Sequence, residues 1–453
     1  MMQKKVFTAA LVAGLSALAG TAQADDNGLL TLTRGDSSLS LYGILDAAYA
    51  EQNHAYSLNN TLPNQSYSYV GKIYATAPSQ SAFVNGGLSD SRLGIKGSTG
   101  LVGDTKAIFD LESGFDLTNM KLNNAAKTLA ENGGTHSAAN LPPTMNADSS
   151  LNGQLFGRAA WVGVQAGWGT LTYGTQNNPA KDAIGAYDPV KSDTFSPFGE
   201  SGTVGGGLGS SEESRLHNSV KYTTKFGSGF DASVAYQFGN DWNTSYGHTY
   251  AAKVGYENGS LGVTAAYSNS KDAIVAAPGA AVGQIKINIF DVDGYLLAAK
   301  YKATDAAHFS GGYEHYQRKN PGDAASVQQI GSIWGYAVSS TVAGFGAANA
   351  GASQAFSVYF AGGDYDFTPD LNLAVGYYNT KADANTSPTG ANTDYTISTW
   401  STVLKYKLNK LVDLYAAATV NSYGGGVYTS VAGTANAFAT NVSAYGAGAR
   451  FKF

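Results

Sequence analysis

The sequence predicts an all-β protein, a sixteen-stranded antiparallel β-barrel that crosses a membrane. About sixteen segments of roughly ten residues alternate apolar with polar or small side chains after residue 37. The connections between them alternate between short turns and long loops. After the N-terminal leader, no apolar run approaches the roughly 20 residues that a membrane-spanning helix needs. Period-two alternation with turns at one edge and loops at the other is typical of a transmembrane barrel.

Sixteen strands need fifteen connections, and the sequence contains seven short turns and eight long loops. Short turns are predicted at 99–104, 166–167, 226–229, 258–260, 304–306, 368–369 and 408–410. Long loops are predicted at about 51–87, 118–153, 176–213, 240–247, 271–290, 319–352, 381–393 and 422–440.

The N-terminus predicts export. Lys4 and Lys5 precede a short apolar run, and Ala22-Gln23-Ala24 fits the small-x-small cleavage rule. We therefore expect residues 1–24 to be a cleaved signal peptide and residues 25–453 to form one transmembrane β-barrel domain.

Composition agrees with a barrel and excludes several function classes. Only 13% of residues are charged, whereas the chain has 56 glycines and 29 tyrosines. Glycine suits turns, tyrosine suits membrane interfaces, and a lipid-facing surface carries few charges. Removing Lys4 and Lys5 changes the formal net charge from −5 to −7, which argues against a nucleic-acid partner. The absence of cysteine excludes disulfides, thiolate metal sites and cysteine nucleophiles.

Strand by strand, the alternation predicts which side chains face lipid and which face the lumen. The first strand, 38–50, separates Leu39, Leu41, Leu45 and Tyr49 from Ser40, Tyr42 and Asp46. In the strand at 105–115, the apolar set that includes Phe109 alternates with Lys106, Asp110 and Glu112.

The strand at 156–165 puts Trp161 on one face and Arg158 on the other. A charge on the lipid face at mid-membrane costs about 2–4 kcal/mol. We therefore expect Arg158 to face the lumen and Trp161, like Phe109, to face lipid. The last strand, 441–453, places Tyr445, Phe451 and Phe453 on one face.

The alternation of side chains along each strand also places other basic residues in the lumen. Arg92 and Lys96 lie opposite Leu93 and Ile95, and Arg215 and Lys221 lie opposite Leu216, Val220 and Tyr222. The predicted lumen lining consists of Lys96, Lys106, Asp110, Glu112 and Lys221.

No catalytic, metal or cofactor site is predicted. No Gly-x-Ser-x-Gly element supports a hydrolase. His308 and His315 are seven residues apart on a predicted strand and so on opposite faces, which does not suit one metal ion. The DVDG at 291–294 lacks the remaining ligands of a calcium loop and is interpreted as a turn. The glycine-rich run at 205–209 lacks the Lys and Ser/Thr of a phosphate loop.

Sequence segments distributed along the whole chain resemble those of a known protein family and occur in the same order. They are SSLSLYGILDAAYA at 37–50, SRLGIKGSTGLVGDTKAIFDLESGFD at 91–116, LFGRAAWVGVQAGWGTLTYGTQ at 155–176, DAIGAYDP at 182–189, NSVKYTT at 218–224, SGFDASVAYQFG at 228–239 and GAGARFKF at 446–453. The chain resembles the general, non-specific trimeric porins of Gram-negative bacteria, particularly the neisserial and burkholderial branch.

The resemblance implies a homotrimer of water-filled barrels in which the third extracellular loop, about 176–213, folds inward and narrows the pore. It assigns Arg92, Arg158 and Arg215 to the wall of the constriction. It places Asp182, Asp188, Asp193 and Glu200 on the opposing acidic face of the loop. Two departures stand out: Thr175 occupies a position where many relatives have arginine, and the loop has Pro197-Phe198-Gly199-Glu200 where some relatives have Pro-Glu-Phe.

We therefore expect an outer-membrane porin of a Gram-negative bacterium. It would pass small hydrophilic solutes and ions by passive diffusion, without a reaction or cofactor, and touch outer-membrane lipid and lipopolysaccharide. A weak preference for anions is expected, because the predicted lumen cations outnumber the carboxylates on the same strands. Three alternatives remain: a substrate-selective porin for a sugar or an organic acid, a barrel that acts mainly as an adhesin or surface antigen, and a soluble secreted β-protein.

Overall fold

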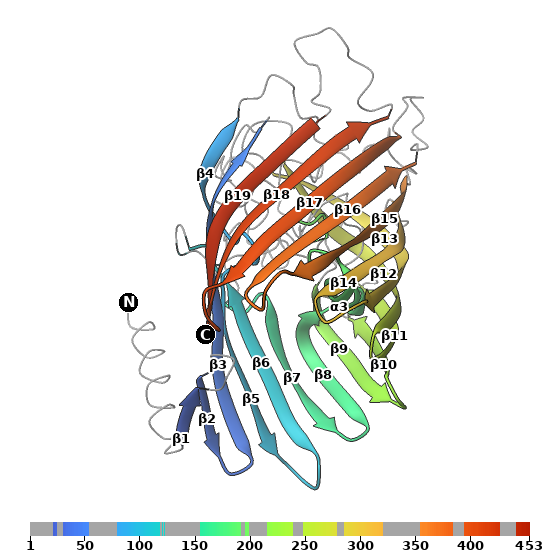
Figure 1. Cartoon of the computed structure of the whole chain (residues 1–453). Coiled ribbons are helices and arrows are strands. Elements are labelled where there is room, and N and C mark those ends of the chain that lie inside the picture. Colours follow the sequence, from blue (N-terminus) through green and yellow to red (C-terminus); the bar gives the residue numbers. More distant parts are fainter. Residues whose placement is uncertain are drawn as a thin grey trace, which may run out of the picture.

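The predicted barrel is confirmed by a computed structural model (Figure 1). It describes residues 21–24, 30–53, 79–117, 120, 122, 155–191, 195–198, 215–238, 248–278, 285–319, 354–383, 394–425 and 441–453. Within these residues, no helix has both the length and the apolar character needed to cross a membrane.

The described strands form one continuous antiparallel sheet. They are β1 (Thr21–Ala24), β2 (Leu30–Arg34), β3 (Ser37–Gln52), β4 (Gln80–Asn85), β5 (Arg92–Gly100), β6 (Lys106–Gly114), β7 (Ala159–Ala166), β8 (Gly169–Asn177), β9 (Arg215–Phe226), β10 (Phe230–Gln237), β11 (Thr249–Asn258), β12 (Leu261–Pro278), β13 (Ile285–Lys302), β14 (Ala307–Lys319), β15 (Gln354–Asp366), β16 (Leu371–Ala382), β17 (Tyr395–Lys407), β18 (Val412–Gly424) and β19 (Asn441–Lys452). One helix, α3 (Pro179–Tyr187), follows β8.

The barrel closes where the two ends of the chain meet. β19 pairs with β3 from Ala444 opposite Gln52 to Lys452 opposite Ile44. Phe453 then exchanges two backbone hydrogen bonds with Gly43. This closure joins the last strand of the sheet to β3, so backbone groups along this seam are satisfied by neighbouring strands.

Both edges of β3 are shared between two partners. On one edge, β4 pairs with the upper half and β5 with the lower half. The other edge pairs with β19 above and with β2 below. Because β4 and β5 together make one wall position, and β1 and β2 only extend the wall, sixteen strands form the barrel among the described residues. β1 lies inside the predicted signal peptide, whose cleavage stays a prediction.

The predicted short turns are confirmed. The predicted loops at 118–153, 240–247, 319–352, 381–393 and 422–440 lie largely outside the described residues. All seven predicted short turns connect consecutive strands and lie at the lower end of the barrel in Figure 1. Two loop predictions are wrong. Residues 271–290 are mostly strand, because β12 and β13 continue as a long hairpin, and Asp291–Gly294 therefore lies inside β13 and not in a turn. The predicted loop at 51–87 contains β4.

The outer surface has the apolar band that lipid requires. Val234 and Val254 are 52% and 49% exposed near the middle of β10 and β11. Exposed aromatic rings lie towards both ends of these strands, with Phe226 and Phe230 stacked beside the short turn and the paired Tyr236 and Tyr250 at the opposite end. Aromatic rings above and below an aliphatic band are typical of a protein in a bilayer.

One facing prediction is wrong. Trp161 pairs with Asp110, and Val162 pairs with Phe109. Directly opposed residues share a face of the sheet, so Trp161 lies on the polar side and Val162, which is 58% exposed, lies on the lipid side. Arg158 nevertheless reaches the lumen, because the β7 ladder begins only at Ala159 and the alternation does not govern the residue before it.

Candidate functional site in the barrel lumen

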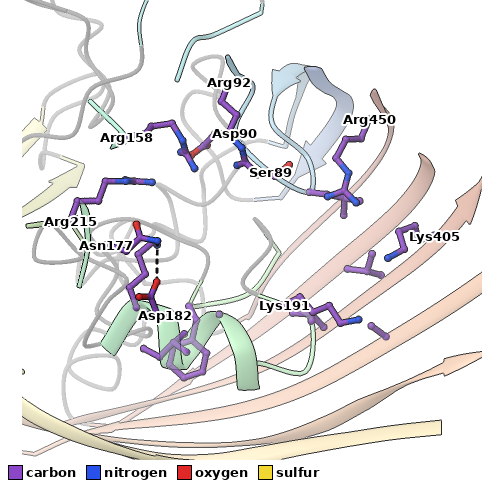
Figure 2. A pocket seen from close by; sticks show the side chains of 18 of the residues that line it. Ser89, Asp90, Arg92, Arg158, Asn177, Asp182, Lys191, Arg215, Lys405 and Arg450 are labelled. Atoms are coloured by element: carbon purple, nitrogen blue, oxygen red, sulfur yellow. Dashed lines mark hydrogen bonds and ion pairs between the residues drawn. The ribbon is translucent and has the colours of Figure 1, made fainter. Parts of the chain in front are cut away.

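The three arginines predicted as a group do lie together. Arg92 begins β5, Arg158 immediately precedes β7, and Arg215 begins β9. All three line one lumen cavity of about 470 Å³ (Figure 2). The starts of three alternate strands of the sheet therefore bring residues 123 positions apart in the chain to one wall.

Two carboxylates on the same wall hold the arginines in place. Arg158 Nη1 lies 2.6 Å from Asp90 Oδ2, and Arg158 Nε lies 2.6 Å from Glu112 Oε1. Arg92 Nε lies 3.6 Å from Glu112 Oε2. Charge-assisted bonds of this length fix a guanidinium far better than contact with water does. The described acidic partners of Arg92 and Arg158 thus come from the barrel wall.

Asp182 is turned towards another lumen residue. It lies in the first turn of α3, and its carboxylate is 2.5 Å from Lys221 Nζ and 3.1 Å from Asn177 Nδ2. Asp193 and Glu200, which were also predicted on the acidic face, lie outside the described residues.

The side of the cavity opposite the arginines is also basic. Lys191 follows α3, Lys405 lies on β17 and Arg450 lies on β19, on the right of Figure 2. Arg450 Nη2 is 2.7 Å from Asp413, and Lys191 Nζ is 3.7 Å from Asp364. Among the described lining residues, seven are basic (Arg92, Arg158, Lys181, Lys191, Arg215, Lys405 and Arg450) and two are acidic (Asp90 and Asp182).

The remaining predicted lumen residues lie below or beside this cavity. Lys96 pairs across the ladder with Asp110, and its ammonium lies 5.3 Å from the centre of the Tyr42 ring. The Tyr42 hydroxyl donates to Asp110 over 2.7 Å. Lys106 is exposed at the start of β6, next to a short turn. These residues form the polar lining of the barrel outside the arginine cluster.

The described part of the third loop is anchored to the barrel wall, beginning at α3. Asn178 caps α3 by accepting a hydrogen bond from the Ala180 amide over 2.9 Å, and its own amide donates to Ser268 on β12 over 2.9 Å. Pro179 occupies the first helical position, where the φ angle fixed by its ring already suits the helix. The helix contacts β10 to β14.

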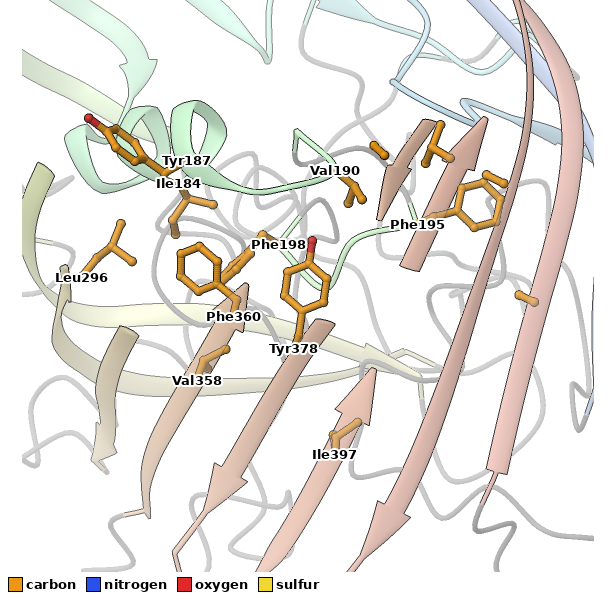
Figure 3. Packing of buried hydrophobic residues seen from close by; sticks show 14 of the residues in the cluster. Ile184, Tyr187, Val190, Phe195, Phe198, Leu296, Val358, Phe360, Tyr378 and Ile397 are labelled. Atoms are coloured by element: carbon orange, nitrogen blue, oxygen red, sulfur yellow. The ribbon is translucent and has the colours of Figure 1, made fainter. Parts of the chain in front are cut away.

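Apolar packing also holds the described part of the loop (Figure 3). Ile184 and Phe198 are almost fully buried, and the Phe198 ring meets Phe360 and Tyr378 edge-on at 5.0 and 5.6 Å between centroids. These loop residues belong to the same buried apolar cluster as residues of the wall. The hydrophobic core among the described residues thus includes the interface between loop and barrel.

Asp188 occupies a different position from the predicted one. It caps the C-terminal end of α3 and is only 4% exposed. Its carboxylate accepts hydrogen bonds from the Tyr378 hydroxyl on β16 and from Ser196 Oγ, the latter over 2.6 Å. These contacts make Asp188 an anchor of the loop and keep it away from the arginines.

Five charged lining residues were not predicted from the sequence: Asp90, Lys181, Lys191, Lys405 and Arg450. Arg450 and Lys405 carried a usable signal, since each alternates with apolar neighbours in a predicted strand. Asp90, Lys181 and Lys191 carried none, because they lie in connections whose path the alternation does not describe.

One cluster among the described residues brings possible metal ligands together. Ligand atoms of His308, Asp364 and Asp366 lie within 4.8 Å of one another. The side-chain amide of Asn372 donates to both carboxylates, over 3.0 and 2.9 Å, and Lys191 adds a cation beside Asp364. The hydrogen bonds from Asn372 and the positive charge of Lys191 therefore already stabilise these two carboxylates.

Comparison with known proteins identifies porins as similar in sequence and in structure. The family model described as Gram-negative porin matches residues 8–426. An outer membrane porin protein of Bordetella pertussis is 27% identical over 418 residues, covering 83% of this chain and 94% of that protein. An anion-selective porin from Comamonas acidovorans has a similar structure, with a TM-score of 0.60, 18% identity and coverage of 92% of this chain and 100% of that one. OmpT of Vibrio cholerae in its trimer form has a TM-score of 0.54 at 16% identity, covering 92% and 100%.

Proposed function

This chain belongs to the Gram-negative porin family, and from that premise we propose that its cation-rich lumen cavity is the constriction of an anion-preferring channel. The protein is an outer-membrane channel for small solutes. The observation that carries the proposal is the imbalance of seven basic against two acidic residues around the cavity. In a narrow aqueous passage, an excess of one sign of charge raises the local concentration of the opposite ion.

The arrangement gives Arg92, Arg158 and Arg215 the role of constriction wall. Arg158 is shared between Asp90 and Glu112 and is thereby held at the rim of the cavity. Lys191, Lys405 and Arg450 face this wall across the opening. A solute that passes between the two sides meets cations on both, which favours anions and polar solutes over cations. The similar structure from Comamonas acidovorans is described as an anion-selective porin, in agreement with this proposal.

We also infer that the chain assembles as a homotrimer within outer-membrane lipid and that it moves solutes by passive diffusion without a chemical reaction. The trimer form of the Vibrio cholerae protein, which has a similar fold, supports the trimer. Cross-linking of the detergent-extracted protein, followed by mass determination, tests the stoichiometry, and a monomeric species alone would contradict it.

The channel is expected to be ohmic and anion-preferring in planar bilayers. In a potassium chloride gradient, the reversal potential should give a chloride-to-potassium permeability ratio of roughly three or more, since each uncompensated charge about 7 Å from an ion in water changes its energy by about RT. A ratio of one or below would contradict the anion preference. Saturable block by a sugar or organic acid would favour a substrate-selective porin, and the absence of any conductance would favour an adhesin.

Anion preference is also expected to fall as the pH rises from 6 to 8. Burial, together with the nearby Arg215 and Arg158 charges, lowers the pKa of Lys181 from 10.5 to about 7, although Asp90 and Asp182 partly oppose the shift. Below pH 7 the Lys181 side chain is a cation, and above it is neutral, so the lumen loses one positive charge. Reversal potentials at both pH values measure the change. Lys181→Met should flatten it, and an unchanged pH response in that variant would exclude Lys181 as its origin.

A further inference from the structure

The wall strand next to β3 is interrupted at the height of the constriction. β4 ends at Asn85 and β5 begins at Arg92. The segment between them, residues 86–91, leaves the ladder, and its Leu88, Ser89 and Asp90 line the lumen cavity. Gly86 has a φ of +76°, a conformation that residues with a Cβ rarely adopt. Through this segment Asp90 reaches Arg158 (Figure 2).

A single carboxylate behind the segment holds it in shape. Asp46, on the lumen face of β3, is fully buried. Its Oδ1 accepts from the Gly87 amide over 2.9 Å, and its Oδ2 accepts from the amides of Leu88 and Ser89 over 3.0 Å each. Three successive amides converging on one carboxylate form an anion nest of the kind that fixes a tight backbone path.

The backbone of Asp46 adds further bonds to the same segment. Its carbonyl accepts from the Gly86 amide over 2.9 Å, and its amide donates to Ser91 Oγ over 3.0 Å. Both ends of residues 86–91 are therefore tied to Asp46, and the middle is tied to its side chain. Asp90 lies between Ser89 and Ser91, so its position follows from these bonds.

Tyr415 completes the arrangement from the other side. Its hydroxyl, on β18, donates to Asp46 Oδ1 over 2.5 Å. A Cβ at Gly87 would lie 1.8 Å from this hydroxyl oxygen, and one at Gly448 would lie 2.5 Å from it. The Tyr415 ring thus occupies space that two glycines leave open, and a side chain at position 87 requires the segment or the Tyr415 ring to shift.

We propose that Asp46 is a positioning residue for the constriction: it holds residues 86–91 so that Asp90 opposes Arg158 and reduces the positive potential of the cavity. The inference rests on the proposed function and adds to it a specificity-determining residue, Asp90, with the device that places it. A purely structural alternative exists, in which the Asp46 cluster only seals the interruption in the wall and Asp90 has no effect on permeation.

The test uses the full-length protein in planar bilayers, with the reversal potential as readout. Asp90→Asn should raise the chloride-to-potassium permeability ratio about threefold, because a unit charge about 7 Å away in water, screened by about 0.1 M salt, shifts the energies of chloride and potassium by about RT/2 each in opposite directions. Gly87→Ala changes no charge but requires the segment or the Tyr415 ring to shift, which disturbs the Asp46 cluster, and it should move the ratio in the same direction. Tyr415→Phe, which removes one hydrogen bond and no charge, should give a smaller shift of the same sign.

The double variant Gly87→Ala with Asp90→Asn separates the two explanations. If the segment acts by placing Asp90, the double variant should have the same ratio as Asp90→Asn alone. An additional, independent shift would overturn the proposal, as would unchanged ratios in Asp90→Asn and Tyr415→Phe. Gly424→Ala is the matched control, since a Cβ there meets nothing within 4 Å.

The variant Arg158→Ala distinguishes a failure of this inference from a failure of the proposed function. If Arg158→Ala changes the permeability ratio and Asp90→Asn does not, the constriction stands and the role of Asp90 falls. If neither changes it, the constriction itself is misplaced. Heat-modifiable migration in gels shows which variants have folded, and Tyr415→Phe keeps the test decisive should Gly87→Ala fail to fold.

Discussion

Replacing Arg158 with alanine is expected to lower the chloride-to-potassium permeability ratio by roughly three- to fivefold, the largest change of any single charge removal in this lumen. The reason is that the substitution removes one cation and simultaneously releases two carboxylates. Asp90 and Glu112 each lie 2.6 Å from the Arg158 guanidinium. Without it they face the cavity with only Arg92 as a described close partner of Glu112, at 3.6 Å.

Reversal potentials in a salt gradient measure this effect, and two variants control for it. Arg158→Lys keeps the charge and should retain most of the anion preference. It loses the guanidinium, whose separate nitrogens bind Asp90 and Glu112 at the same time. Lys106→Ala removes a cation from the exposed start of β6, away from the constriction, and should change the ratio little. Equal shifts in Arg158→Ala and Lys106→Ala would show that the channel senses total charge and has no charge-selective constriction at Arg158.

Replacing Asp188 with alanine is expected to loosen the third loop and widen the channel. The substitution leaves the Tyr378 hydroxyl and Ser196 Oγ without their shared acceptor in a buried site. Each buried polar group left without a partner costs about 1–3 kcal/mol. Phe198 still packs against Phe360 and Tyr378, so the loop should remain near the wall but sample open positions.

Two measurements detect the loosening. Single-channel records should show a higher and noisier conductance, and liposome swelling should admit larger sugars than the parent protein does. Asp188→Asn keeps an acceptor oxygen and should be milder. Asp305→Ala removes a fully exposed turn carboxylate that pairs only with Lys302 among the described contacts, and it should leave sugar uptake unchanged. Parental uptake in Asp188→Ala would mean that apolar packing alone fixes the loop.

Strand alternation predicted the barrel because it reports a property of the whole wall. Each strand must present apolar side chains to lipid and polar ones to water, and this requirement repeats in every hairpin. Arg92, Lys96 and Lys221 were placed correctly for that reason. Residue 161 shows the limit: the alternation in β7 is weak, since small and apolar residues occupy both faces, and Trp161 was assigned to the wrong one.

The site was harder to predict because its charges come from connections. Asp90 lies in an interruption that the sequence shows only as a long polar loop ending near residue 87, so neither β4 nor the break was visible. The resemblance located the third loop but could not distinguish an anchoring carboxylate from one facing the pore. Asp188 and Asp182 are both acidic and six residues apart, and only the docking of α3 separates their roles.

The pairing of β3 has a consequence for how the protein forms. Besides β2 and β4, this strand pairs with β5, about 50 residues later, and with β19, at the far end of the polypeptide. Contacts between such distant segments are slow to find, and until they form, β19 and part of β3 present open hydrogen-bonding edges. The cylinder can therefore close only once its last strand is available. A chain released into the periplasm must be shielded from self-association until its last dozen residues are available to complete the ring.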